Sequence, residues 1–118
     1  MQDFSINYIG KLTFSDCRNL NKVTILHPNI NGTLAEGPFR NCDKLETVVL
    51  PEDTKIITKR MFDIDNTSLT NNIKNVNIPN GCTSIETKAF YRCANLKSLF
   101  IPSSVTYIGQ YAFSYAGC

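Results

Sequence analysis

Phenylalanine recurs along this chain at nearly regular intervals, and this recurrence constrains the fold more than any other feature. The recurring residues are Phe14, Phe39, Phe62, Phe90 and Phe113. Their intervals are 25, 23, 28 and 23 residues. A sequence period of about 20 to 50 residues is typical of proteins in which each repeat forms one turn of a stacked solenoid. We therefore expect a repeat fold.

Several apolar columns keep the same register as the phenylalanines. In the turn that begins at Phe39, the following columns hold Leu45, Val48, Leu50 and Pro51. The column five residues before each phenylalanine holds Ile9, Leu34, Ile57, Ile85 and Ile108. Insertions before Pro28 and after Phe62 explain the two longer intervals. Residues 1–118 are therefore expected to form one domain of four connected turns, with a partial turn at each end.

Each turn contains one segment with the composition of a short β-strand. These segments are residues 23–25, 48–50, 76–78 and 99–101. They are rich in β-branched and apolar residues, and a proline that cannot join a ladder follows each of them after at most two residues. We predict parallel strands, one per turn of about 23 residues, stacked about 4.8 Å apart. The return segment with the phenylalanine is expected to be a single helical turn or a second short strand.

The residues between the core positions of these strands are the candidate binding face. One outward column holds Lys22, Thr47, Asn75 and Ser98, and the other holds Thr24, Val49, Asn77 and Phe100. Phe100 is an aromatic residue in a column of smaller side chains, and an exposed aromatic on a rigid sheet is a good anchor for a protein ligand. The alternative is that the terminal segment near Tyr115 covers Phe100.

The five cysteines follow the repeat, with one exception. Cys17, Cys42 and Cys93 share the column three residues after the phenylalanine, and Cys82 lies in a second apolar column. We interpret these four as small buried hydrophobic residues. A disulfide between Cys17 and Cys42, on adjacent turns, is the alternative. Cys118 is out of register, and we expect it to be exposed and able to pair between chains.

The composition argues against several classes of function. A net charge of +2, with the cations scattered among aspartates, does not favour nucleic acid as a partner. No stretch approaches the roughly 18 apolar residues of a membrane span. The single histidine, His27, is interpreted as a loop residue without a catalytic partner or a zinc motif. The acids Asp16, Asp43, Asp63 and Asp65 are interpreted as solvated loop residues. We therefore predict no enzyme, no catalytic residue, no metal site and no cofactor.

The combined columns resemble the BspA-type leucine-rich repeat, also called the Treponema-type. The fourth turn reads Ile85-x4-Phe90-x2-Cys93-x2-Leu96-x2-Leu99-x-Ile101-Pro102. The third turn departs from this pattern at Met61 and Asp65, and its insert, residues 64–72, is expected to bulge. The resemblance implies a right-handed solenoid. It also implies a surface protein of the kind that adheres to host or neighbouring-cell proteins.

We therefore expect a protein-interaction module that acts in cell-surface adhesion and binds a host or extracellular-matrix protein. The expected location is the cell surface or the exterior, although the first residues lack the pattern of a signal peptide. An intracellular, cytoplasmic scaffold without an adhesive role is the alternative. Nothing that resembles a cap follows Phe113, so we expect a fragment or short array whose uncapped ends permit homo-oligomers.

Overall fold

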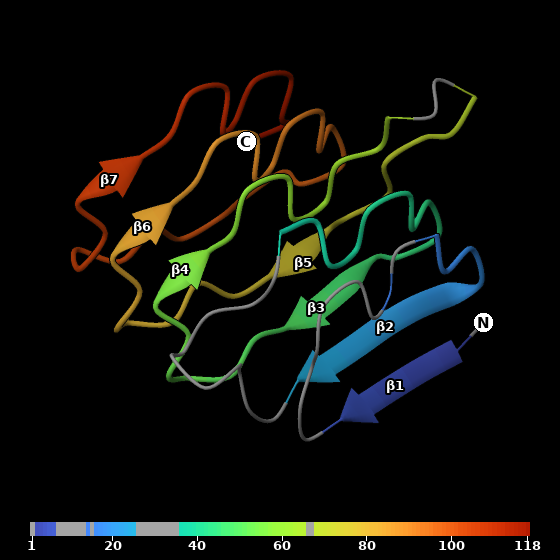
Figure 1. The fold of residues 1–118 in the computed structure, drawn as a ribbon, viewed down its shortest axis with the longest axis horizontal. Helices are drawn as coiled ribbons and strands as arrows, with labels where there is room; N and C mark the ends of the chain where they lie inside the picture. The colour runs from blue at the N-terminus through green and yellow to red at the C-terminus, as the bar shows by residue number, and fades with distance from the viewer. Residues whose placement is uncertain (1, 7–13, 15, 26–35, 66–67) are drawn as a thin grey trace.

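The strands of the computed structural model form two parallel sheets (Figure 1). The structure describes residues 2–6, 14, 16–25, 36–65 and 68–118, and of residues 2–6 it describes the backbone alone. The first sheet contains β1 (Gln2–Ile6), β2 (Leu20–Ile25), β3 (Thr47–Val49) and β5 (Asn75–Val76), in that order. The second contains β4 (Ile56–Ile57), β6 (Ser84–Ile85) and β7 (Tyr107–Ile108), in that order. No helix occurs within these described ranges.

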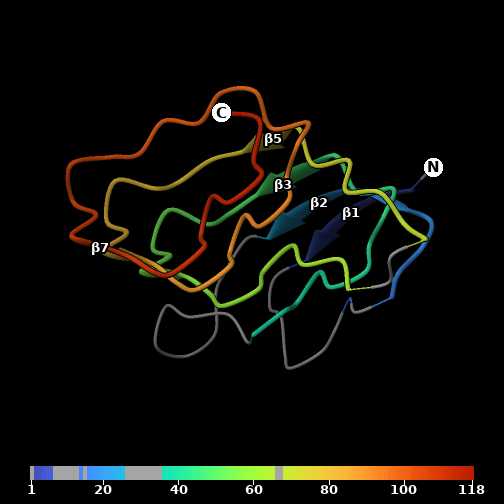
Figure 2. The same cartoon turned by 90° about the horizontal axis from the view of Figure 1, so that it is seen from above.

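The register of the first sheet confirms the alignment of the repeats. Val23 lies beside Val48 in the ladder, and Val48 lies beside Val76. The adjacent outward column aligns Lys22, Thr47 and Asn75 in the same way. Successive turns therefore stack on one another despite their two insertions. Viewed from above, β1, β2, β3 and β5 again follow one another as the chain passes round (Figure 2).

The structure has more strands in some turns than the sequence pattern predicts. Ile57, Ile85 and Ile108, five residues before a phenylalanine, lie in the strands of the second sheet. A second short strand therefore exists on the return path, but it precedes the phenylalanine, whose own segment forms hydrogen-bonded turns in the described residues. Strand β1, which pairs with β2, is not among the four predicted strands. The sequence did not predict β1 because this strand lies in an incomplete turn, where few repeat columns are available for alignment.

The fourth predicted strand, residues 99–101, is not formed. The ladder already ends at Val76, because the Asn77 side chain takes over the hydrogen bonds of the next position. Its Oδ1 accepts from the Leu50 N–H at 2.8 Å, and its Nδ2 donates to the Leu50 carbonyl at 3.1 Å. Residues 99–101 also lie in the last described turn, where a strand has a neighbour on one side only. Without a backbone ladder on either side, the segment stays extended but unpaired.

The phenylalanine rings stack along the interior from one turn to the next. Their centroids are 5.7, 5.7, 5.6 and 5.2 Å apart from Phe14 through to Phe113. Phe39, Phe62 and Phe90 are fully buried. Such ring pairs contribute about 0.5 to 1.5 kcal/mol beyond the burial of their area. The predicted role of these residues as a continuous core is confirmed.

Left-handed backbone corners flank the phenylalanines on both sides. Gly37, Arg60, Lys88 and Tyr111 hold the corner two residues before, and Asp16, Asn41, Arg92 and Tyr115 hold the corner two residues after, with φ between 54° and 62°. Between the corners, the phenylalanine N–H donates to the next turn. Phe62 donates to the Ala89 carbonyl at 3.4 Å, and Phe90 donates to the Ala112 carbonyl at 2.8 Å. The return segments are thus joined by backbone hydrogen bonds although they are not strands.

Burial of the apolar columns declines towards the C-terminal end. In the column before the prolines, Ile25 is 1% exposed, Leu50 2%, Ile78 7% and Ile101 39%. Ile85 is fully buried, whereas Ile108 in the same column of the next turn is 50% exposed. The prediction that Ile101 and Ile108 belong to the core is therefore wrong here, because no further turn of the described chain covers them.

The described residues of the third-turn insert, 64–65 and 68–72, lie at the upper right of Figure 1. Its end is fixed by Asn71, whose side chain is buried. The Asn71 Nδ2 donates to the Phe62 carbonyl at 2.9 Å, and its Oδ1 accepts from the Ile73 N–H at 3.0 Å. These bonds satisfy backbone groups that lose their regular partners because of the insertion.

We expect the variant Phe62→Ala to lower the free energy of unfolding by about 3 to 5 kcal/mol, because it leaves a cavity and breaks two ring contacts. Urea denaturation followed by circular dichroism measures this change. Phe100→Ala, at an exposed ring, is the matched control and is expected to change stability by no more than about 0.5 kcal/mol. Equal effects of the two substitutions would contradict the assignment of the core.

Candidate functional site

An open groove of about 780 Å³ lies on the strand face and spans three turns. Its lining residues are Thr47, Val48, Val49, Lys74, Asn75, Val76, Asn77, Ser98, Leu99 and Phe100. The structure thus brings together six of the eight residues proposed from the sequence, and Lys22 and Thr24 lie outside the lining. Lys74 and the partly buried Leu99 were missed, because the pattern assigned outward roles to alternate strand positions alone.

Phe100 is the most prominent side chain of the groove. It is 75% exposed, and the smaller Val49, which lies two turns earlier in the same outward column, is also exposed. The alternative that the terminal segment covers Phe100 is wrong for the described chain. The Tyr115 ring instead contacts the Tyr91 ring edge-on, with centroids 5.9 Å apart. Phe100 and Val49 are therefore available as apolar contacts for a ligand.

Polar contacts hold the rest of the groove in place. The Asn75 Nδ2 donates to the Thr47 Oγ1 at 3.4 Å. The Lys74 Nζ lies 3.2 Å from the Glu46 carboxylate at the edge of the groove. Together with the two bonds between Asn77 and Leu50, these contacts order the polar side chains before any ligand binds. The groove can therefore offer two apolar contacts, Phe100 and Val49, together with ordered polar groups, and protein interfaces commonly combine both.

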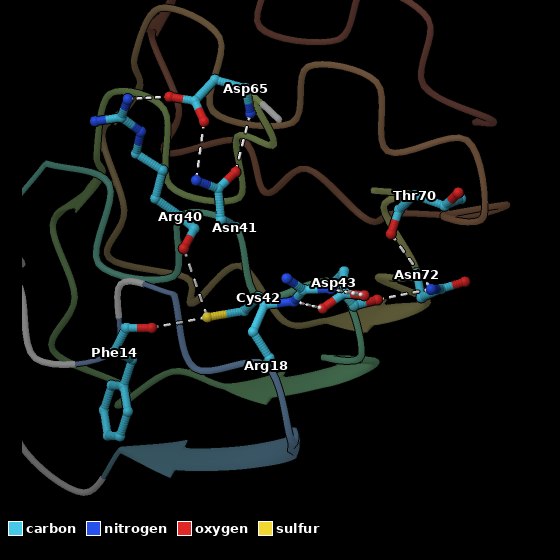
Figure 3. Close-up of polar contacts among 9 residues, drawn as sticks. All are labelled: Phe14, Arg18, Arg40, Asn41, Cys42, Asp43, Asp65, Thr70 and Asn72. Atoms are coloured by element: carbon cyan, nitrogen blue, oxygen red, sulfur yellow. Dashed lines mark hydrogen bonds and ion pairs between the residues drawn. The ribbon is translucent and has the colours of Figure 1, made fainter. Parts of the chain in front are cut away.

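The flank next to the strands is joined by polar side chains from successive turns (Figure 3). Arg18 pairs with Asp43 at 2.6 Å, and Arg40 pairs with Asp65. The hydrogen bond from Arg18 holds the pKa of Asp43 below its ordinary value. The pKa of Asp65 is lowered by hydrogen bonds from Arg40 and then from Asn41. These acids therefore connect turns rather than forming a reactive pair.

Asp63 corrects the interpretation that every loop acid is solvated. Its side chain is buried, and the Arg60 guanidinium lies 3.5 Å from its carboxylate. Among the described residues, no three histidine, cysteine or acidic side chains gather as a metal site. His27 lies outside the described residues. Within the ranges that the structure covers, no helix is long and apolar enough to cross a bilayer.

The cysteines are free thiols with very different exposure. Cys42, Cys82 and Cys93 are buried, Cys17 is partly buried and Cys118 is exposed. This confirms the interpretation of the repeat cysteines as buried residues, and the Cys17–Cys42 disulfide is absent from the structure. Burial raises the pKa of the Cys42 and Cys93 thiols to about 12, and it also raises the pKa of Cys82. Buried neutral thiols of this kind are inert.

We expect a maleimide at pH 8 to modify Cys118 rapidly in the folded protein and to leave Cys42, Cys82 and Cys93 unmodified until urea is added. A thiol whose pKa is raised by folding stabilises the fold below its unfolded pKa, about 8.5. That contribution is lost as the pH rises through the folded value. The free energy of unfolding should therefore fall between pH 9 and 12, where Cys42 and Cys93 ionise.

Mass spectrometry of the labelled protein measures the maleimide reaction, and rapid modification of Cys93 at pH 8 would contradict the labelling prediction.

Comparison with known proteins places these observations in a family. Residues 2–118 match the family described as the BspA type leucine rich repeat region, in six copies. A search of the curated proteins found no match. The structure is similar to the crystal structure of a leucine rich cell surface protein from Faecalibacterium prausnitzii A2-165, with 25% sequence identity and a TM-score of 0.63. The alignment covers 93% of this chain and 34% of that protein, so this chain spans about a third of its relative.

Proposed function

Because this chain belongs to the family of BspA-type leucine-rich repeat proteins, we propose that it is a protein-interaction module whose ligand binds in the strand-face groove. The observation that carries the proposal is the exposure of Phe100 and Val49 in one groove lined by three turns. Aromatic residues with an apolar neighbour dominate the binding energy of many interfaces. The partner that fits this groove is a protein with a small apolar projection and polar groups around it.

The adhesive role is the finer part of the proposal. We propose that the module acts at the cell surface or outside the cell and binds a host or extracellular-matrix protein. The similarity to a leucine rich cell surface protein supports this location, as does the family. The competing proposal is a cytoplasmic scaffold with reduced thiols. The single domain over residues 1–118 stays a prediction from the alignment of the repeats, and the right-handed sense of the coil stays a prediction from the resemblance.

We expect Phe100→Ala to weaken binding to the protein partner at least tenfold while leaving the fold intact. The wild type and the variant are compared on a panel of purified extracellular-matrix proteins by surface plasmon resonance. Tyr107→Ala is the matched control, because Tyr107 is an aromatic residue of 56% exposure that lies outside the groove. Unchanged affinity in Phe100→Ala, or equal loss in both variants, would overturn the assignment of the groove.

A further inference from the structure

The acidic residues are absent from the last part of the chain. All ten of them lie at or before Glu86, whereas residues 87–118 contain Lys88, Arg92 and Lys97. The cations are therefore not uniformly scattered among aspartates, which corrects the interpretation drawn from the total charge. The last turns form a region with positive charge and no carboxylate of its own.

Two of these cations alternate with three tyrosine rings on the return face. The Lys88 Nζ lies 5.8 Å from the centre of the Tyr111 ring and 5.0 Å from that of Tyr91. The Arg92 guanidinium carbon lies 5.4 Å from the centre of the Tyr91 ring and 6.0 Å from that of Tyr115. Tyr111, Lys88, Tyr91, Arg92 and Tyr115 thus follow one another in space. We call these five residues the tyrosine–cation cluster.

Lys88 and Arg92 lack the acidic partners that the arginines of the earlier described turns have. Arg18, Arg40 and Arg60 each form an ion pair with an aspartate. No carboxylate among the described residues lies within 4 Å of Lys88 or Arg92. In the column directly after the phenylalanine, the buried Asp63 of the third turn is replaced by Tyr91 in the fourth. The face therefore changes from internally paired charges to charges that are available to a ligand.

Lys88 and the three tyrosines of the cluster line a hollow of about 480 Å³ together with Ser114, and Arg92 lies outside this lining. Tyr111 and Tyr115 are exposed, as is Arg92. Lys88 and Tyr91 come from the fourth turn, and Tyr111, Ser114 and Tyr115 come from the turn that stacks on it. No aliphatic side chain lines this hollow.

We propose that the tyrosine–cation cluster binds an acidic glycan, a saccharide that carries carboxylate or sulfate groups. The guanidinium and ammonium groups supply charge-assisted hydrogen bonds to the anionic groups. The phenol and serine hydroxyls donate and accept, as the hydroxyls of a sugar require, while the ring surfaces pack on its C–H groups. A peptide ligand fits less well, because the hollow offers no aliphatic pocket for its apolar side chains.

Contacts within the cluster prepare it for such a ligand. Lysine and arginine normally lose much rotamer freedom when they are fixed at an interface. Here the tyrosine rings already hold both cations, and Tyr91 and Tyr115 meet edge to face. The loss of freedom on binding is correspondingly smaller, which favours affinity for a ligand of low charge density. This site is separate from the groove around Phe100, so the two proposals can fail independently.

The test measures binding of defined probes to the whole 118-residue chain by isothermal titration calorimetry. Oligogalacturonate supplies carboxylates, a heparin oligosaccharide supplies sulfates, and methyl-esterified oligogalacturonate supplies the same sugar without charge. Oligoglutamate supplies carboxylates on a peptide. We expect at least tenfold tighter binding of one acidic saccharide than of both the neutral ester and oligoglutamate. The preferred acidic saccharide identifies the anionic group.

Substitutions at four residues locate the binding. Lys88→Asn and Arg92→Asn remove the charges with a residue that tolerates the left-handed backbone found at both positions. Each is expected to weaken binding of the acidic saccharide at least tenfold, while Lys97→Asn, a charge removed outside the cluster, changes it less than twofold. Urea midpoints confirm that the variants are folded, and Tyr115→Asn gives a second test through the rings.

Three results would overturn the proposal. Equal binding of oligoglutamate and the acidic saccharides would show attraction of charge alone. Equal losses in Lys97→Asn and Arg92→Asn would place the binding outside the cluster. Absence of binding to every acidic saccharide at millimolar concentration would exclude a glycan site. Phe100→Ala should leave saccharide binding unchanged, which separates a failure here from a failure of the groove.

Discussion

The stacking of one turn on the next is the constraint on which the rest of this structure depends. A single turn of about 23 residues cannot enclose its own apolar side chains, so each turn is completed by its neighbours. The phenylalanine rings make this dependence concrete, since Phe39, Phe62 and Phe90 are each covered on both sides by another ring. Ile101 and Ile108 are exposed because no further described turn covers them. The strands are short because side-chain stacking, and not a long ladder, joins the turns.

Most of the fold could be predicted because each turn repeats the same columns, so several residues indicate the role of one position. The alignment of Val23, Val48 and Val76 follows from counting residues after the phenylalanine. Hydrogen bonding could not be predicted in this way, since the Asn77 side chain ends a ladder that the apolar pattern would continue. The groove could be predicted because outward side chains alternate with buried ones along each strand. The tyrosine–cation cluster was not, because it combines columns on the return face that have no common apolar pattern.

The two candidate surfaces use different properties of the same coil. The strand face has a regular backbone, so its chemistry is set by single outward residues such as Phe100 and Asn77. The return face contains left-handed corner residues two positions before or after the phenylalanines, and there side chains of adjacent turns contact one another. Ion pairs occupy this face in the earlier turns, whereas Lys88 and Arg92 contact tyrosines in the later ones. Surface chemistry thus changes along the coil while the core remains uniform.

The left-handed corners have a consequence for how such a chain can diversify. An ordinary residue in this conformation costs about 1 to 2 kcal/mol, which is why glycine often occupies such positions. Here glycine, asparagine, arginine, lysine and tyrosine all occupy equivalent corners, because backbone hydrogen bonds on each side hold the geometry. A substitution at a corner therefore alters the surface at a nearly constant backbone cost. The coil can acquire a new ligand through these positions without disturbing a single core contact.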